Sequence, residues 1–130
     1  MLSLLSRRII TSPLRRSLTI LPPNLNKKYL PNEEWISDVK EGVKFGITEN
    51  AVEQMGEIVF LEYGSVSGDV VEKNDELATI ESVKSVQILN APFDCVVVET
   101  NNNLEECLDS LNESPEDEEN SWIFKLEKRE

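Results

Sequence analysis

The residue with the clearest chemical potential in this sequence is a lysine in a short polar connection. Lys84 lies between the apolar stretches 77–80 and 86–89, which residues 81–85 connect. If those stretches are adjacent strands, the connection is a hairpin, and the lysine projects into solvent from a rigid support. An amide formed on its nitrogen would remove the charge and extend the side chain into an arm. A lysine in a turn is usually only solvated, so the hairpin alone leaves both interpretations open.

Other residue types limit the chemistry of the chain. There is no histidine, which removes the commonest general base and metal ligand. Cys95 and Cys107 lack the paired spacing of a zinc or redox site. A zinc or redox site therefore has little support, and we expect free thiols at both cysteines.

A short internal repeat flanks the lysine. Residues 70–77 (VVEKNDEL) align without gaps to residues 97–104 (VVETNNNL), with five of eight positions identical. Each copy is expected to be a strand that enters an Asn-rich turn, because Asn tolerates the left-handed backbone conformation. The repeat indicates either chance reuse of acidic β sequence or a domain of two similar halves.

Most of the chain from about residue 27 onward has the pattern of short strands between turns, which indicates a sandwich or barrel. Strands are expected at 43–47, 58–61, 77–80, 86–89, 95–98 and 122–126. Thr48 is placed to cap a helix that runs through Met55, with Gly56 just past its end. A second, weaker helix is expected over 104–111, and the acidic stretch 116–119 has the composition of a solvated loop.

The first 25 residues differ from the rest. They contain four arginines, four serines, two threonines and no acidic residue. This composition is typical of a mitochondrial transit peptide, whose cationic helix is drawn by a negative-inside potential; the alternative is a disordered basic tail of a cytosolic protein. We expect residues 1–25 to be the transit peptide, residues 26–130 to be the working domain, and the mitochondrial matrix to be its compartment.

Without the first segment the chain is strongly acidic. Residues 26–130 keep nine of the 13 basic residues and all 25 acidic ones, a net charge of −16. Phosphate backbones would repel such a domain, which argues against a nucleic-acid partner. The charge either steers the domain onto basic docking surfaces or serves solubility alone. No apolar run is long enough to span a membrane.

Several blocks, in the right order, resemble the H proteins of the glycine cleavage system. The sequence ESVKSV at 81–86 is similar to the family's ESVKA lipoylation sequence, more than to the DKA turn of acyltransferase lipoyl domains or the MKM turn of biotin carriers. Residues 46–60 (GITENAVEQMGEIVF) resemble its GIT-x-x-A-x-x-x-LG-x-I-V-F block. Further similar positions are Lys28-Tyr29-Leu30-Pro31, Glu34-Trp35, Leu104, Asn112, Pro115 and Trp122.

The resemblance, which covers about residues 27–126, implies a mainly β fold: a barrel-sandwich hybrid of two similar halves, here with one or two short helices. It implies (R)-lipoate bound covalently to Lys84. The preceding Glu81, Ser82 and Val83 would then form the turn that the attaching enzyme recognises, although Glu81 is equally compatible with simple solvation. Val83 and Val86 are expected to hold the hairpin together rather than to contact lipoate.

The implied function is that of a carrier and not of an enzyme. In this family the lipoyl arm takes the aminomethyl group from the pyridoxal-phosphate enzyme glycine decarboxylase and presents it to the tetrahydrofolate-dependent aminomethyltransferase. Dihydrolipoamide dehydrogenase reoxidises the arm, and a lipoyl or octanoyl transferase attaches it. One alternative is a relay protein that supplies lipoyl groups to other mitochondrial complexes. Another is an unmodified interaction paralogue.

Three positions depart from the family's pattern. Glu33 replaces the usual His of HEW, Cys95 replaces a Gly in the strand after the arm, and Ser121 replaces the Gly before the late Trp. A missing Gly means either a position that needs no positive φ or one that carries strain. These departures put efficient docking to glycine decarboxylase in doubt, and they would suit a chain retained mainly to relay lipoyl groups to other complexes. They leave the turn at Lys84 unchanged.

Overall fold

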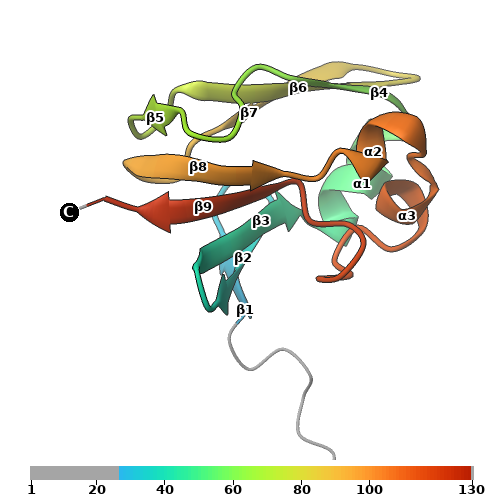
Figure 1. Ribbon diagram of the computed structural model, residues 1–130. Coiled ribbons are helices and arrows are strands. Elements are labelled where there is room, and N and C mark those ends of the chain that lie inside the picture. The colour runs from blue at the N-terminus through green and yellow to red at the C-terminus, as the bar shows by residue number, and fades with distance from the viewer. Residues whose placement is uncertain (1–26, 130) are drawn as a thin grey trace, which may run out of the picture.

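A computed structural model describes residues 27–129, which form two antiparallel sheets and three short helices (Figure 1). In chain order the elements are β1 Lys27–Leu30, β2 Glu34–Val39, β3 Gly42–Ile47, α1 Glu49–Met55, β4 Ile58–Tyr63, β5 Val70–Val71, β6 Glu76–Ser82, β7 Val86–Asn90, β8 Cys95–Thr100, α2 Asn103–Glu106, α3 Asp109–Glu113 and β9 Phe124–Lys128. The expected transit peptide, residues 1–25, lies outside the described residues.

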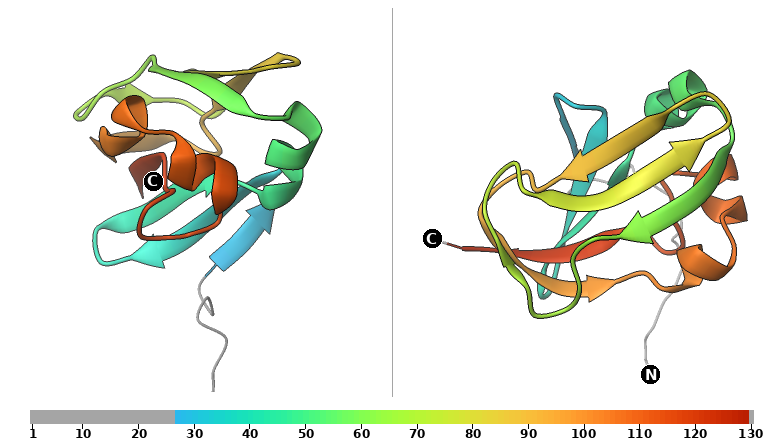
Figure 2. Two further views of the ribbon diagram at one scale, coloured as in Figure 1. Left: turned by 90° about the vertical axis from the view of Figure 1, so that its right-hand side faces the viewer. Right: turned by 90° about the horizontal axis from the view of Figure 1, so that it is seen from above.

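The larger sheet has six strands in the order β1-β2-β3-β9-β8-β5, and the smaller has three in the order β4-β6-β7. The sheets form two layers with the apolar core between them, and the helices gather at one end (Figure 2). In residues 27–129 neither sheet closes into a barrel. The expected mainly β class is confirmed, with three short helices where one or two were expected. None of these helices has the length and apolar character needed to cross a membrane.

Aromatic side chains fill much of the space between the layers. Phe45 and Phe124 are fully buried on neighbouring strands and are direct partners across the β3–β9 ladder. Tyr63 meets Phe124 edge to face, with ring centroids 5.2 Å apart. Such pairs add to the free energy gained by removing apolar area from water.

Helix α1 begins and ends where the sequence predicts. The Thr48 hydroxyl accepts a hydrogen bond from the Ala51 N–H at 3.1 Å, which satisfies one of the free donors of the first turn. Gly56, with a φ of 83°, follows the last residue and donates its N–H to the Val52 carbonyl at 2.9 Å. Local capping chemistry therefore determines both ends of the helix that later supports the hairpin.

The prediction of one helix over 104–111 is wrong. Cys107 is extended, with a φ of −149°, so α2 ends before it and α3 begins two residues after it. The break allows Asn112 to reach the edge of β4, where its side-chain amide accepts from the Ile58 N–H at 2.8 Å and donates to the Ile58 carbonyl at 3.0 Å. Tertiary pairing here overrides the local helical pattern.

The acidic stretch 116–119 is a loop, as predicted, but it is not merely solvated. The Glu116 carboxylate accepts from the Tyr29 hydroxyl at 2.6 Å and the Glu49 N–H at 2.9 Å. Glu118 accepts from the Ser37 hydroxyl at 2.6 Å. The loop thus joins β1, β2 and α1, which are distant from it in sequence.

The internal repeat is only partly reflected in the fold. Its two strands, β5 and β8, are hydrogen-bonded neighbours, with Val71 opposite Cys95. Asn74 has the expected left-handed φ of 77°, but Asn101 is not among the described residues with positive φ. The second copy continues into α2 rather than into a strand, and the Asn101 side-chain amide donates to the Trp122 carbonyl at 2.8 Å.

Candidate functional site

The predicted hairpin around Lys84 is present. Strands β6 and β7 pair in antiparallel fashion, with Glu81 opposite Val86 at the last registered position before the turn. Lys84 lies in that turn and is exposed. The turn lies at the end of the molecule where α1 is found, because its backbone and side chains contact the C-terminal end of that helix.

The hydroxyl of Ser82 organises the turn. It donates to the Met55 carbonyl of α1 at 2.7 Å and accepts from the backbone N–H groups of Ser85 at 3.1 Å and Lys84 at 3.3 Å. A further backbone bond, from Val83 N–H to the Glu57 carbonyl at 3.0 Å, holds the turn to the residue after Gly56. Ser82 was expected only as part of a recognition turn, and the structure gives it a supporting role as well.

Gly56 provides the surface over which the Lys84 side chain passes. A Cβ at this position would lie 3.1 Å from Cγ2 of Val83 and 3.4 Å from Cε of Lys84. The absence of a side chain therefore leaves room for the lysine stem, in addition to allowing the positive φ. Among residues 27–129, no hydrogen bond or ion pair engages the Lys84 ammonium. The anchor is braced while its terminal nitrogen stays accessible.

The two valines beside the lysine are not packed inside. Val83 and Val86 are each 63% exposed, so their expected role in holding the hairpin together does not come from burial in the core and stays a prediction. The hydrogen bonds of Ser82 and Val83 hold the turn and need no buried side chain. Glu81 is partly buried between Phe60 and Val86 on the neighbouring strands.

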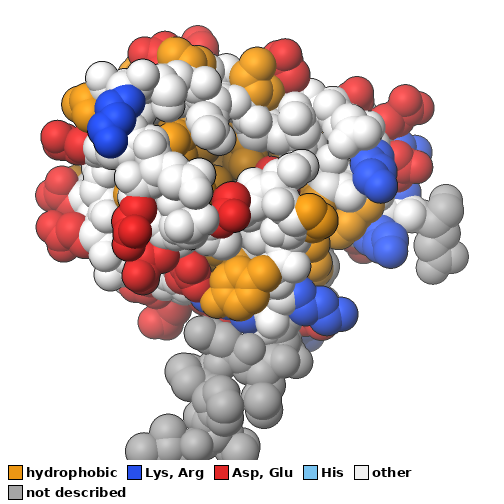
Figure 3. Space-filling model, turned by 180° about the vertical axis from the view of Figure 1, so that it is seen from behind, with side chains coloured by type: hydrophobic (Ala, Val, Ile, Leu, Met, Phe, Trp, Pro, Cys, Tyr) orange, Lys and Arg blue, Asp and Glu red, His pale blue; other side chains and the backbone are white. Residues whose placement is uncertain are grey.

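A groove, here called the β7 groove, runs between β7 and the turn that joins β1 to β2. It consists of two adjoining pockets of about 260 and 520 Å³ that share Pro31, Asn32, Glu34 and Asn90. Gln54 of α1 lines one pocket and Lys73 lines the other. Seen from behind, the molecule is hollowed at the centre of this face, and acidic side chains crowd one side of it (Figure 3).

Glu34 lies where the two pockets of the β7 groove meet. It is only 7% exposed, and within the described part of the chain no hydrogen bond or ion pair reaches its carboxylate. Burial raises the pKa of this carboxyl to about 7. Sequence reasoning used Glu34 only as part of a family match. The sequence signal that could have indicated a role for Glu34 is an acidic residue directly before a tryptophan in a strand.

Replacing Glu34 by glutamine should change how stability depends on pH. The folded-state pKa of about 7 lies above the ordinary 4.5, so the folded protein holds the Glu34 proton more tightly than the unfolded chain does. The protonated carboxyl therefore contributes stability below pH 4.5, and this contribution is lost as pH rises through 7. From pH 4 to pH 8 the wild type should lose about 2–3 kcal/mol of unfolding free energy relative to Glu34→Gln. Urea unfolding at intermediate pH values measures this difference, with exposed Glu62→Gln as control. A pH-independent difference would contradict the raised pKa.

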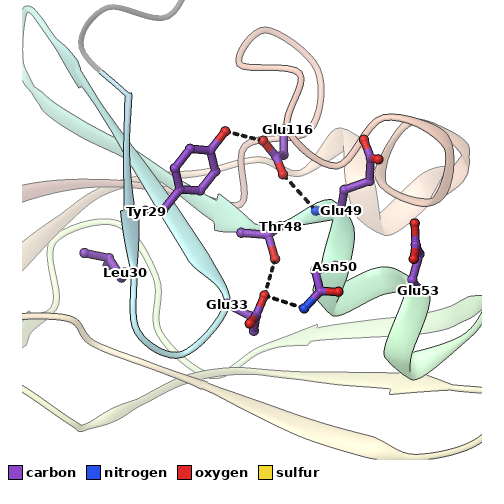
Figure 4. A pocket seen from close by; sticks show the side chains of 8 residues that line it. All are labelled: Tyr29, Leu30, Glu33, Thr48, Glu49, Asn50, Glu53 and Glu116. Carbon is purple, nitrogen blue, oxygen red and sulfur yellow. Dashed lines mark hydrogen bonds between the residues drawn. The ribbon is translucent and has the colours of Figure 1, made fainter.

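The first departure from the family pattern, Glu33, joins a network at the start of α1 (Figure 4). Its backbone has a φ of 63°, and its carboxylate accepts from the Thr48 hydroxyl at 3.0 Å and the Asn50 amide at 2.9 Å. Glu33 therefore supports the N-terminus of the helix whose other end braces the lysine turn. Glu49, Glu53 and Glu116 line the same shallow pocket.

The other two departures carry no backbone strain. Neither Cys95 nor Ser121 has a positive φ, and both are fully buried. Burial raises the pKa of the Cys95 thiol to about 11, which keeps it protonated, and the Ser121 hydroxyl donates to the Ser110 carbonyl at 2.9 Å. Both cysteines are free, as predicted.

The fold and the site together define a small two-sheet domain that presents one braced lysine beside a groove. The chain belongs to the glycine cleavage H-protein family, because a model of that family matches residues 27–130. The glycine cleavage system H protein of Trichormus variabilis is 42% identical over 99 residues, covering 76% of this chain and 74% of that protein. The H protein of Thermotoga maritima is 38% identical over 101 residues, covering 78% and 79%.

A solved structure agrees with this assignment. The crystal structure of a glycine cleavage system H protein from Mycobacterium marinum matches with a TM-score of 0.70 and 27% sequence identity. The match covers 82% of this chain and 86% of that one. The similarity thus extends over most of the described domain and is not confined to the lysine turn.

Proposed function

We propose that Lys84 carries a lipoyl group in amide linkage, and that this chain is the lipoyl carrier of a glycine cleavage system. The observation that supports this most directly is the braced turn: Ser82 and Gly56 secure the anchor, while the Lys84 nitrogen has no partner within residues 27–129. A fixed anchor with a free arm raises the effective concentration of the carried group at each partner. The protein itself supplies no catalyst on this proposal.

The residues around the arm fit its proposed cargo. A lipoyl group supplies a disulfide that can accept an aminomethyl group and become a thiol, and the cargo amine is cationic at neutral pH. Strand β7 leads from the turn along the β7 groove, where the buried carboxylate of Glu34 lacks a partner among the described side chains. An ammonium group placed there would compensate that buried charge. We assign Glu34 the role of holding the cargo amine.

The proposal extends to partners and compartment. Glycine decarboxylase would load the arm, the aminomethyltransferase would unload it, dihydrolipoamide dehydrogenase would reoxidise it, and a lipoyl or octanoyl transferase would attach it. Glu81, Ser82 and Val83 would form the turn that the last enzyme recognises. The acid-free segment 1–25 directly precedes the family match and supports import into the mitochondrial matrix.

Intact-mass measurement tests the modification directly. Protein purified from its native source should be heavier by one lipoyl group than the polypeptide calculated from its determined N-terminus, and peptide mapping should place that mass on Lys84. A Lys84→Arg variant expressed in the same cells should carry no added mass. An unmodified wild-type protein would contradict both the glycine-cleavage role and the relay alternative.

A further inference from the structure

The outer face of the small sheet is not covered by any other described element (Figure 1). Two cross-strand rows of side chains lie on it, because residues paired across antiparallel strands point to the same face. Phe60, Glu81 and Val86 form one row, and Glu62, Thr79 and Ile88 form the other. The three apolar members are among the most exposed large hydrophobic residues, at 48% for Phe60, 63% for Val86 and 48% for Ile88.

These six side chains, here called the hairpin face, combine an apolar surface with acidic charge. Exposed apolar residues gathered on one face, rather than scattered singly, are typical of binding surfaces. The strands of this sheet contain three glutamates and no lysine or arginine. The nearest cation in sequence is Lys84 itself, in the turn that joins two of the strands. A complementary partner surface would be apolar at its centre and would carry Lys or Arg at its rim.

The hairpin face lies close to Lys84 in the structure, which favours a partner that acts on the lysine nitrogen itself. Val86 is two residues from Lys84, and Phe60 and Val86 flank Glu81 at the last row before the turn. An enzyme that acylates the lysine nitrogen must approach within one side chain of this backbone. Enzymes that act at the far end of a finished arm need not approach so closely.

We propose that the hairpin face is the docking surface for the enzyme that acylates Lys84, and this inference rests on the proposed lipoyl attachment. In the reaction of a lipoate–protein ligase, the Lys84 nitrogen attacks the carbonyl carbon of lipoyl adenylate. The new C–N bond forms, the C–O bond to the phosphate breaks, and AMP leaves with the electron pair. The lysine ammonium releases one proton before the attack and one after it.

Steady-state acylation of the full, unmodified chain tests the docking surface, with a lipoate–protein ligase, ATP and lipoate as reagents. The double variant Phe60→Thr with Val86→Thr should raise KM for the chain at least about fivefold and leave kcat unchanged, because the contacts form before the chemical step. Val70→Thr is the matched control: Val70 is also a strand valine at 63% exposure, but it lies on β5 of the other sheet. Its KM should stay within about twofold of the wild type.

A competition experiment measures binding of the chain to the ligase without requiring that the lysine itself reacts. A Lys84→Arg chain should inhibit acylation of the wild type, and adding Phe60→Thr and Val86→Thr to it should weaken inhibition by the same factor as KM rises. Equal thermal unfolding midpoints would show that the variants are folded. If KM for the double variant matches that of the Val70→Thr control, and the double substitution does not weaken inhibition by the Lys84→Arg chain, the hairpin face is not the docking surface. If the wild type is not acylated, or Lys84→Arg is, the proposed lipoyl attachment itself fails.

Discussion

Lys84→Arg should abolish glycine-dependent exchange of CO2 in a reconstituted glycine cleavage system. Arginine keeps the positive charge and similar length, but its guanidinium holds its proton far more tightly than a lysine ammonium does, so it does not supply the neutral amine that forms the amide. The substitution should change the free energy of unfolding by less than about 0.5 kcal/mol, because the side chain is exposed and makes no hydrogen bond or ion pair in the described region. The measurement is incorporation of labelled CO2 into glycine.

Lys40→Arg is the control for this experiment, since Lys40 is also an exposed turn lysine and lies between β2 and β3, outside both the hairpin and the β7 groove. It should support exchange at the wild-type rate. Exchange that survives Lys84→Arg would show that Lys84 does not carry the cargo. If exchange survives while other lipoyl-dependent complexes lose their lipoate in the variant cells, the relay role is preferred.

Trp35→Ala should lower the free energy of unfolding by about 3–5 kcal/mol, a large part of the stability of a domain this size. The Trp35 side chain is fully buried, and its Nε1 donates to the Pro115 carbonyl at 3.1 Å. The Lys27 ammonium lies 4.5 Å from the ring centroid. Gly46 is packed so closely that a Cβ there would be 2.7 Å from the ring. Truncation therefore leaves a cavity and an unpaired carbonyl.

Urea unfolding monitored by far-ultraviolet circular dichroism measures this loss. Trp35→Phe separates the two contributions: it keeps most of the volume but removes the Nε1 donor, so it should cost about 1–3 kcal/mol. A loss below about 1 kcal/mol for Trp35→Ala would mean that the strands β1 to β3 do not depend on this packing.

The sequence predicts best where local chemistry decides. The cap at Thr48 and the stop at Gly56 follow from the needs of helix ends, and both are observed. The hairpin at Lys84 follows from two apolar stretches with a polar connection. The split of the 104–111 helix was not predictable in this way, because Asn112 pairs with Ile58, a residue 54 positions away.

Some features of the candidate site could likewise be predicted from local sequence, and others could not. The identity of Lys84 as the anchor could be inferred from its turn and from the family blocks around it. The exposure of Val83 and Val86 could not be inferred from the sequence, because apolar residues beside a turn are equally compatible with packing inward. The role of the loop 116–119 was also missed, because carboxylates in an acidic run usually face solvent and only the fold brings Tyr29 to Glu116.

What the sequence alone determined is therefore the class of fold, the helix caps, the hairpin and the lysine at its tip, all of which depend on near neighbours in the chain. Only the tertiary structure decided what braces that lysine and what lies beside it. Met55 and Gly56 meet Ser82 and Lys84 through the packing of a helix end against a hairpin. The burial that raises the pKa of Glu34 likewise arises where separate segments form a groove. Such contacts depend on distances between remote segments, which no local pattern specifies.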